Sequence, residues 1–256
     1  MNPNIEKKIT AIIKTFERPE CLDTLIKSIK KYYPNLPIIV ADDSKSPKSR
    51  EDVDYHIIPF DSGVTKGRNY LVEQVKTPYV LVLDDDYCFI RETRLEKLLY
   101  VLENSDVDII GGKWIWKKQV HSYHGKLLCE NGVLRITKES YGETSGFKLY
   151  DIVHNFFLAR TDTLKRYPWD ERIKVIDHED YFLTHKNKIK VALHSEVFIY
   201  HNQFRSKSYN QYRNRSKEDY QLYKEKHGIS EFVIGSHFET LDKKYFSNET
   251  ISKYLT

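Results

Sequence analysis

An alternation of continuous apolar segments with amphipathic ones runs through the first 114 residues of this chain. "KKITAIIKTF" is a short run rich in β-branched residues, and "RPECLDTLIKSIKKYYP" follows it with apolar residues at helical spacing. The pattern repeats in "LPIIVADDS", "GVTKGRNYLVEQVKTP", "YVLVLDDD", "TRLEKLLYVLENSD" and "VDIIGGKW". Apolar strands that alternate with helices predict parallel βα units in which helices cover both faces of the sheet.

The rhythm changes after residue 113. "KWIWKKQVHSYHGKLLCENGVLRITKES" alternates in short segments with glycine-containing turns, which predicts antiparallel hairpins. Helical spacing returns in "YDIVHNFFLARTDTLKRYPWDERI" and "DHEDYFLTHKNKI", before a last strand in "VALHSEVFIYH" and a basic, helical tail. We therefore predict an α/β fold of one continuous domain, with halves at 1–112 and 113–202 and a tail at 203–256.

Composition indicates the cellular compartment and the partners expected for the protein. No stretch approaches the roughly 20 apolar residues of a membrane span, and the start "MNPNIEKKIT" lacks the apolar core of a signal peptide. The 3 cysteines are odd in number and widely spaced, which suits a reducing compartment. We expect a cytoplasmic protein. The net charge of +4 is mild, so no nucleic-acid partner is expected, but Arg and Lys crowd residues 203–227.

Two acid clusters follow predicted strands, at Asp42 and Asp43 and at 84–86. Ligands of open parallel sheets bind beyond the carboxyl ends of the strands. Three adjacent carboxylates repel one another unless a cation compensates, which favours a divalent metal, Mn²⁺ or Mg²⁺, that also binds a diphosphate. An Asp pair alone is more often a helix cap, whereas the triple acid after "YVLVL" favours the metal.

The loop after the first predicted strand, "KTFERPE", contains no glycine, so it is not a phosphate-binding loop of the dinucleotide or P-loop kind. Its residues Thr15, Phe16 and Glu17, together with the Asp42/Asp43 pair, are placed to hold a base and ribose. "GVTKGRN" carries Lys66 and Arg68 near a helix start. It is a weak phosphate signal, and an ordinary loop and cap is equally consistent with it.

These segments, in this order, resemble the nucleotide-sugar glycosyltransferases of the GT-A fold, family 2 type. The segments are "KTFERPECLDTLIKSIKKYYP", "ADDS", "GRNYLVEQVKTPYVLVLDDDYCF", "TRLEKL", "NFFLARTD" and "HED", within residues 8–201. The resemblance is closer to the β1,4-N-acetylgalactosaminyltransferase (GM2/GD2-synthase-like) group. It implies a UDP-sugar donor bound in the first half and an acceptor bound in the second half, which carries the catalytic residues.

The resemblance also implies roles for particular residues. The donor would be bound by Thr15, Phe16, Glu17, Arg18, Asp42, Asp43, Lys66, Gly67, Arg68, Asp84 and Asp85. Asp84 and Asp86 form the family's D-x-D and would both serve the metal site, with Asp86 as the direct ligand and Asp84 nearer the ribose or sugar. His201 would be a further metal ligand, unless it simply ends its strand. In "DHEDYFL", Asp180 would be the general base, with Glu179 as the alternative, unless these acids only face water at a helix start.

Acceptor contacts are expected from Trp114, Trp116, His154 and Asn155, since aromatic faces can stack on pyranose rings and alternate strand residues share a face. Arg205 and Lys207 in the tail would close over the diphosphate, or the tail would contact an anionic membrane carrying a glycolipid acceptor. Two other functions are consistent with the acids: a nucleotidyltransferase, although its glycine-rich loop is missing, and a noncatalytic sugar-nucleotide or glycan-binding module.

Overall fold

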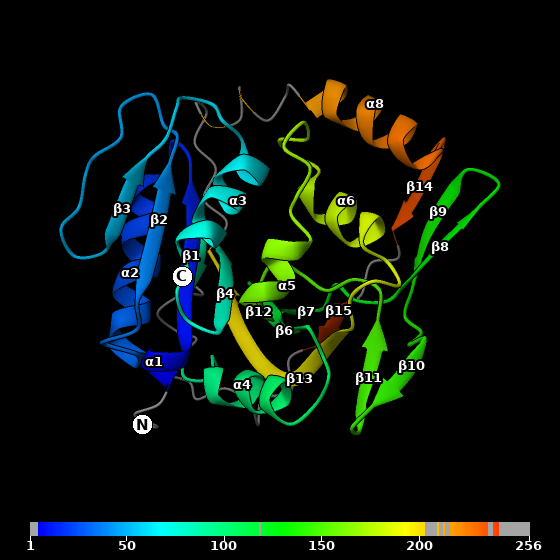
Figure 1. The fold of residues 1–256 in the computed structure, drawn as a ribbon, viewed down its shortest axis with the longest axis horizontal. Coiled ribbons are helices and arrows are strands. Elements are labelled where there is room, and N and C mark those ends of the chain that lie inside the picture. Colours follow the sequence, from blue (N-terminus) through cyan, green and yellow to red (C-terminus); the bar gives the residue numbers. More distant parts are fainter. Residues whose placement is uncertain are drawn as a thin grey trace.

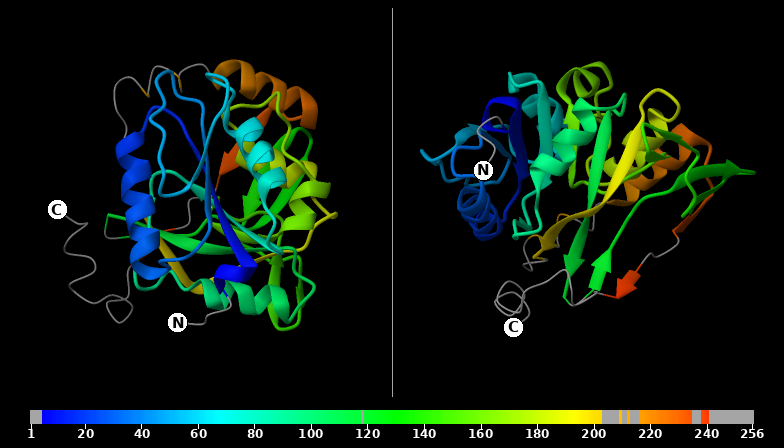
Figure 2. Two further views of the ribbon diagram at one scale, coloured as in Figure 1. Left: turned by 60° about the vertical axis from the view of Figure 1, so that its left-hand side comes forward. Right: turned by 90° about the horizontal axis from the view of Figure 1, so that it is seen from below.

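A computed structural model describes residues 5–117, 119–202, 209, 212, 216–234 and 238–240. A sheet of 12 strands runs through the molecule in the order β10-β11-β13-β6-β12-β4-β1-β2-β3, and β5, β7 and β15 pair outside this path (Figures 1 and 2). Its strands are β1 (Ile9–Thr15), β2 (Ile38–Asp42), β3 (Asp54–Ile57), β4 (Tyr79–Asp84), β5 (Tyr87–Cys88), β6 (Ile109–Trp116), β7 (Gln119–His121), β10 (Gly142–Thr144), β11 (Phe147–Tyr150), β12 (Phe157–Arg160), β13 (Val191–His201) and β15 (Phe238–Thr240). A second sheet contains β8 (Lys126–Glu130), β9 (Val133–Thr137) and β14 (Glu231–Ile234).

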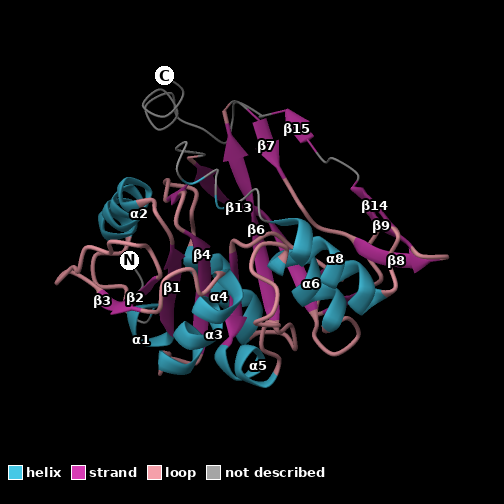
Figure 3. Ribbon diagram, turned by 90° about the horizontal axis from the view of Figure 1, so that it is seen from above, coloured by secondary structure: helices cyan, strands magenta, loops and turns pink. Residues whose placement is uncertain are grey.

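The helices are α1 (Ile5–Lys8), α2 (Pro19–Tyr32), α3 (Val64–Gln74), α4 (Leu95–Glu103), α5 (Thr161–Arg166), α6 (Asp177–Thr184) and α8 (Ser216–His227). None of the helices within the described ranges is both long and apolar enough to cross a membrane. Figure 3 shows the helices distributed along the whole length of the sheet. The GT-A type of α/β fold predicted from the sequence is confirmed by this arrangement and by the structural matches reported below.

The first half contains the predicted βα units. β4, β1, β2 and β3 run parallel to one another, with α2 between β1 and β2 in the chain and α3 before β4. α2 begins at Pro19, which suits a first helical turn. β3 was not predicted, because its end residues are exposed and its middle residues only half-buried, within a polar segment.

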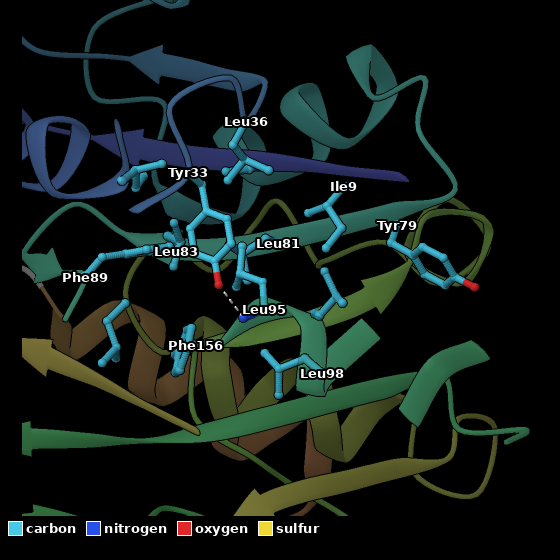
Figure 4. Packing of buried hydrophobic residues seen from close by; sticks show 14 of the residues in the cluster. Ile9, Tyr33, Leu36, Tyr79, Leu81, Leu83, Phe89, Leu95, Leu98 and Phe156 are labelled. Carbon is cyan, nitrogen blue, oxygen red and sulfur yellow. Dashed lines mark hydrogen bonds between the residues drawn. The ribbon is translucent and has the colours of Figure 1, made fainter. Parts of the chain in front are cut away.

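The core forms on both faces of the sheet, as continuous apolar strands require. Along β1, Ile9 and Ile13 pack in one cluster with α2 and α4, whereas Ile12 packs on the other face with α3, α5 and α6. The buried hydroxyl of Tyr33 ties this first cluster together, because it accepts a hydrogen bond of 2.9 Å from the backbone nitrogen of Leu95 (Figure 4).

The second half differs from the prediction in one element. The helical spacing predicted around residues 150–160 was wrong: β12 enters the sheet between β4 and β6 and is antiparallel to both, and only α5 is helical there. A fully buried strand and a buried helix give similar apolar runs, so periodicity alone did not separate them. The predicted hairpins are present, and β13 runs parallel to β6.

Two glycines of β6 let the segment before β12 approach closely. A Cβ on Gly111 would lie 2.8 Å from Val153, and one on Gly112 would lie 2.9 Å from the carbonyl oxygen of Val197 and would overlap the ring of Phe156. This close approach sets the position of His154 and Asn155, which lie between these contacts.

Candidate active site

A cavity of about 910 Å³ opens beyond the carboxyl ends of β1 and β4, where parallel sheets bind ligands. Both halves of the chain line it. The sequence-predicted residues that line it are Phe16, Arg18, Asp43, Arg68, Asp84, Asp85, Asp86, Trp114, His154, Asn155, Glu179 and His201.

Two arginines pair with the three consecutive acids. Arg68, whose side chain is only 2% exposed, donates to Asp84 over 2.6 Å and also pairs with Asp177 of α6. Arg18 donates to Oδ2 of Asp86 over 2.7 Å and pairs with Asp85. Arg68 therefore joins β4 to α6 as a buried counter-ion. The sequence analysis predicted that Arg68 contacts the nucleotide, whereas in the structure its partners are these two carboxylates.

Asp85 is 1% exposed and is held by a contact with β1. It accepts a hydrogen bond of 2.7 Å from Thr15 at the end of β1. Burial raises the pKa of Asp85 to about 6, while Arg18 acts in the opposite direction. Asp85 thus fastens β1 to β4, and Thr15 is engaged in this contact and is absent from the cavity lining.

Asp86 and His201 form a pair that fits a divalent cation. Oδ1 of Asp86 lies 3.3 Å from Nε2 of His201. Neighbouring ligands of an octahedral ion at about 2.1 Å are separated by about 3 Å, so the two atoms are spaced like adjacent ligands. Burial alone would raise the pKa of Asp86, but His201 and Arg18 hold it below its ordinary value. The described residues contain no group of three or more His, Cys, Asp or Glu side chains gathered for a metal, so a substrate diphosphate and water would complete the coordination.

The cavity wall near β1 suits a nucleobase. Lys14 pairs with Asp43, whose Oδ2 also accepts the backbone N–H of Gly63 over 2.9 Å. The Lys14 amine lies 4.9 Å from the ring centre of Phe16, and the pKa of Lys14 is lowered by burial. This wall presents the aromatic ring of Phe16 next to a hydrogen-bond donor, Lys14, and an acceptor, Asp43, which are paired with each other.

Several predicted donor residues lie away from the cavity. Asp42 points to Tyr55 and to the backbone nitrogen of Ser44. Glu17, at φ 54°, accepts from the backbone nitrogen of Lys45. Lys66 is exposed outside the cavity lining.

Gly67 has a packing role, since a Cβ there would lie 2.6 Å from the Lys14 side chain. Arg205 and Lys207 lie outside the described residues.

The two candidate bases on α6 have different surroundings. Glu179 lines the cavity and accepts a hydrogen bond of 2.8 Å from the hydroxyl of Tyr123. Burial raises the pKa of Glu179, and the bond from Tyr123 partly offsets this.

Asp180 is 1% exposed, is absent from the cavity lining and lies 2.8 Å from the Lys226 amine and 2.7 Å from Nε2 of His227, both on α8. The structure therefore places the preferred candidate of the sequence analysis in a structural ion cluster, and leaves its alternative facing the cavity.

The predicted acceptor residues are partly engaged with one another. The rings of Trp114 and His154 stack with centroids 4.0 Å apart at 20°, which covers one face of the indole. His154 also lies 2.6 Å from the hydroxyl of Tyr87, and Asn155 Oδ1 lies 2.7 Å from Nδ1 of His178. Trp116 lies outside the cavity lining.

Sequence reasoning missed Lys14, Tyr123, Asp177 and His178, as well as the contribution of α8. Asp177 directly precedes "HED" and His178 is its first residue, so both open the same helix, a position that signals proximity to the site. Tyr123 lies in the loop between β7 and β8, whose sequence carries no such signal.

Comparisons with known proteins agree with this geometry. Residues 10–167 match the family described as Glycosyl transferase family 2. The chain therefore belongs to glycosyl transferase family 2, and the predicted resemblance is confirmed.

Two curated relatives are β1,4-N-acetylgalactosaminyltransferases. The chain is 37% identical over 213 residues to β1,4 N-acetylgalactosaminyltransferase 1 of Rattus norvegicus, a match that covers 77% of this chain and 39% of the relative. It is 38% identical over 213 residues to β1,4 N-acetylgalactosaminyltransferase 2 of Mus musculus, covering 78% and 41%. The match thus spans about two fifths of each relative's length.

Solved structures share the fold at low identity. S. aureus TarS 1–349 in complex with UDP-GlcNAc matches with a TM-score of 0.58 at 16% identity, over 84% of this chain and 64% of that one. The mannosyltransferase PcManGT of Pyrobaculum calidifontis, in complex with GDP-Man and Mn²⁺, matches with a TM-score of 0.54 at 11% identity, over 84% and 62%.

Proposed function

We propose that this protein is an inverting, metal-dependent glycosyltransferase. It moves a hexosamine or hexose, in the first place N-acetylgalactosamine, from a UDP-sugar to a hydroxyl of a glycan or glycolipid, in the synthesis of a surface polysaccharide or glycolipid. One observation supports this most: the Asp86/His201 pair lines the same cavity as Glu179, the one of the two candidate bases that faces it. The N-acetylgalactosaminyltransferase relatives support the donor sugar.

The donor occupies the cavity beside β1 and β4. Phe16 packs on the uracil ring, and Asp43 with Lys14 faces its polar edge, where an acceptor and a donor are both required. Asp86 and His201 would hold Mn²⁺ or Mg²⁺, which when bound would supply positive charge to the departing diphosphate. The buried arginines keep the acids in place without that ion.

The acceptor enters from the side of α6. Glu179 takes the proton of the acceptor hydroxyl as its oxygen attacks the anomeric carbon. Tyr123 holds the carboxylate by its 2.8 Å hydrogen bond and keeps it from turning away. A single displacement inverts the configuration, and UDP departs on the opposite side of the sugar.

A panel of UDP-sugars tests this proposal. Donor hydrolysis without acceptor is measured with Mn²⁺ and with Mg²⁺ for UDP-N-acetylgalactosamine, UDP-N-acetylglucosamine, UDP-galactose and UDP-glucose. We expect UDP release that needs the divalent ion and is fastest with UDP-N-acetylgalactosamine. Release of pyrophosphate in place of UDP would show a nucleotidyltransferase, and binding without turnover would show a noncatalytic module.

A further inference from the structure

α8 packs directly against the catalytic helix. Lys226 and His227 bind Asp180 of α6. Tyr223, on the same helix, is 1% exposed and is part of the core. Asp219 accepts the backbone N–H groups of Lys174 and Val175, over 2.8 and 2.7 Å, just before α6 begins. Figures 1 and 3 show α8 beside α6. These contacts fix α8 at both of its ends, so its remaining side chains have defined positions.

One aromatic side chain of this helix is left facing the cavity. Tyr220 lines the cavity and is 46% exposed. No hydrogen bond holds its hydroxyl within the part of the chain that the structure describes. A large aromatic ring held on a fixed helix and half open to a cavity offers an apolar face at low entropic cost to a ligand.

The neighbours of Tyr220 indicate which ligand this is. Tyr123, the residue that donates to Glu179, lines the same cavity as Tyr220, and α8 packs on α6, the helix that carries Glu179. Tyr220 therefore lies on the side of the base, whereas the nucleobase wall and the Asp86/His201 pair line the cavity through β1, β4 and β13. A hydroxyl that reaches Glu179 brings its own sugar ring to this side.

We propose that Tyr220 forms an acceptor subsite together with Tyr123, in which the ring of Tyr220 stacks on a pyranose of the acceptor glycan next to Glu179. This rests on the proposed function. Trp114, predicted for this role, has one face covered by His154, which leaves Tyr220 as the more open aromatic surface. α8, like α6, lies outside the region that the family model matches, residues 10–167.

Matched variants test the subsite. The probes are p-nitrophenyl β-hexosides (galactoside, glucoside and N-acetylglucosaminide). Binding is followed by saturation-transfer NMR in the presence of UDP, and transfer is followed by steady-state kinetics. Tyr220→Ala is expected to raise the acceptor KM and Kd roughly tenfold, about 1.4 kcal/mol, with donor KM and acceptor-independent hydrolysis unchanged. Tyr220→Phe keeps the ring and is expected to stay near wild type.

Tyr100 provides the control, because it is 62% exposed on α4 and is absent from the cavity lining. Tyr100→Ala is expected to change none of these values. An unchanged acceptor Kd in Tyr220→Ala, or an equal rise in donor KM, would overturn the subsite. Donor hydrolysis is independent of the acceptor, so its absence in the wild-type protein would count against the proposed function, while the NMR titration still decides the subsite.

Discussion

Oδ1 of Asp86 lies 3.3 Å from Nε2 of His201, because β5 begins at the next residue and pairs with β13, which sets Tyr87 opposite His201. Arg18 occupies the other oxygen of Asp86, so the oxygen that faces His201 is the one presented to a cation. The pair thus brings together Asp86 from the first half of the chain and His201 from the second half.

Replacing either member of this pair is expected to weaken metal binding. Loss of an outer-shell partner costs about 10–100-fold in affinity, so Asp86→Asn or His201→Ala should cost at least about 100-fold. Isothermal titration of Mn²⁺ with UDP present measures this directly. His194→Ala is the control, because His194 lies on the same strand outside the cavity lining. Unaltered Mn²⁺ affinity in both site variants would place the metal elsewhere.

Glu179 and Asp180 are adjacent but should respond differently to amide substitution. Glu179→Gln is expected to lower kcat at least about 100-fold, as general-base removal does, with UDP affinity and Tm preserved. Asp180→Asn should instead lower stability by about 1–3 kcal/mol, because it removes the charge that His227 and Lys226 bind. Kinetics and thermal denaturation of both variants separate the roles. The reverse pattern would identify Asp180 as the general base.

The sequence predicted the fold and the acids but not their partners. Strand-end acids and the "HED" segment are local signals, so Asp84, Asp86 and Glu179 were found. The choice between Glu179 and Asp180 depends on which side of α6 meets α8, and Asp180 and Lys226 are 46 positions apart. The link from Arg68 to Asp177 spans 109 positions. Such contacts are set by tertiary packing, and no local pattern reports them.

The pH dependence of transfer should follow Glu179. Burial raises its pKa above the ordinary value of about 4.3. Because the base must be ionised, kcat/KM is expected to fall as the pH drops through this raised pKa. Tyr123→Phe removes a hydrogen bond that stabilises the carboxylate, so it should move the acid limb to higher pH. A pH–rate profile with Mn²⁺ saturating at each pH tests the shift, and an acid limb moved to lower pH would contradict the assignment.

Gly112 should tolerate no side chain, although it contacts no ligand. A methyl group there would overlap Phe156 and lie 2.9 Å from the carbonyl oxygen of Val197, so Gly112→Ala is expected to cost about 1–3 kcal/mol through overpacking. The displaced 153–156 segment carries His154 and Asn155, so donor or acceptor KM should rise as well. Gly142→Ala is the control, because a Cβ at Gly142 meets nothing within 4 Å. Urea denaturation of the two variants measures the difference, and equal midpoints would show that β6 and this segment can move apart at little cost.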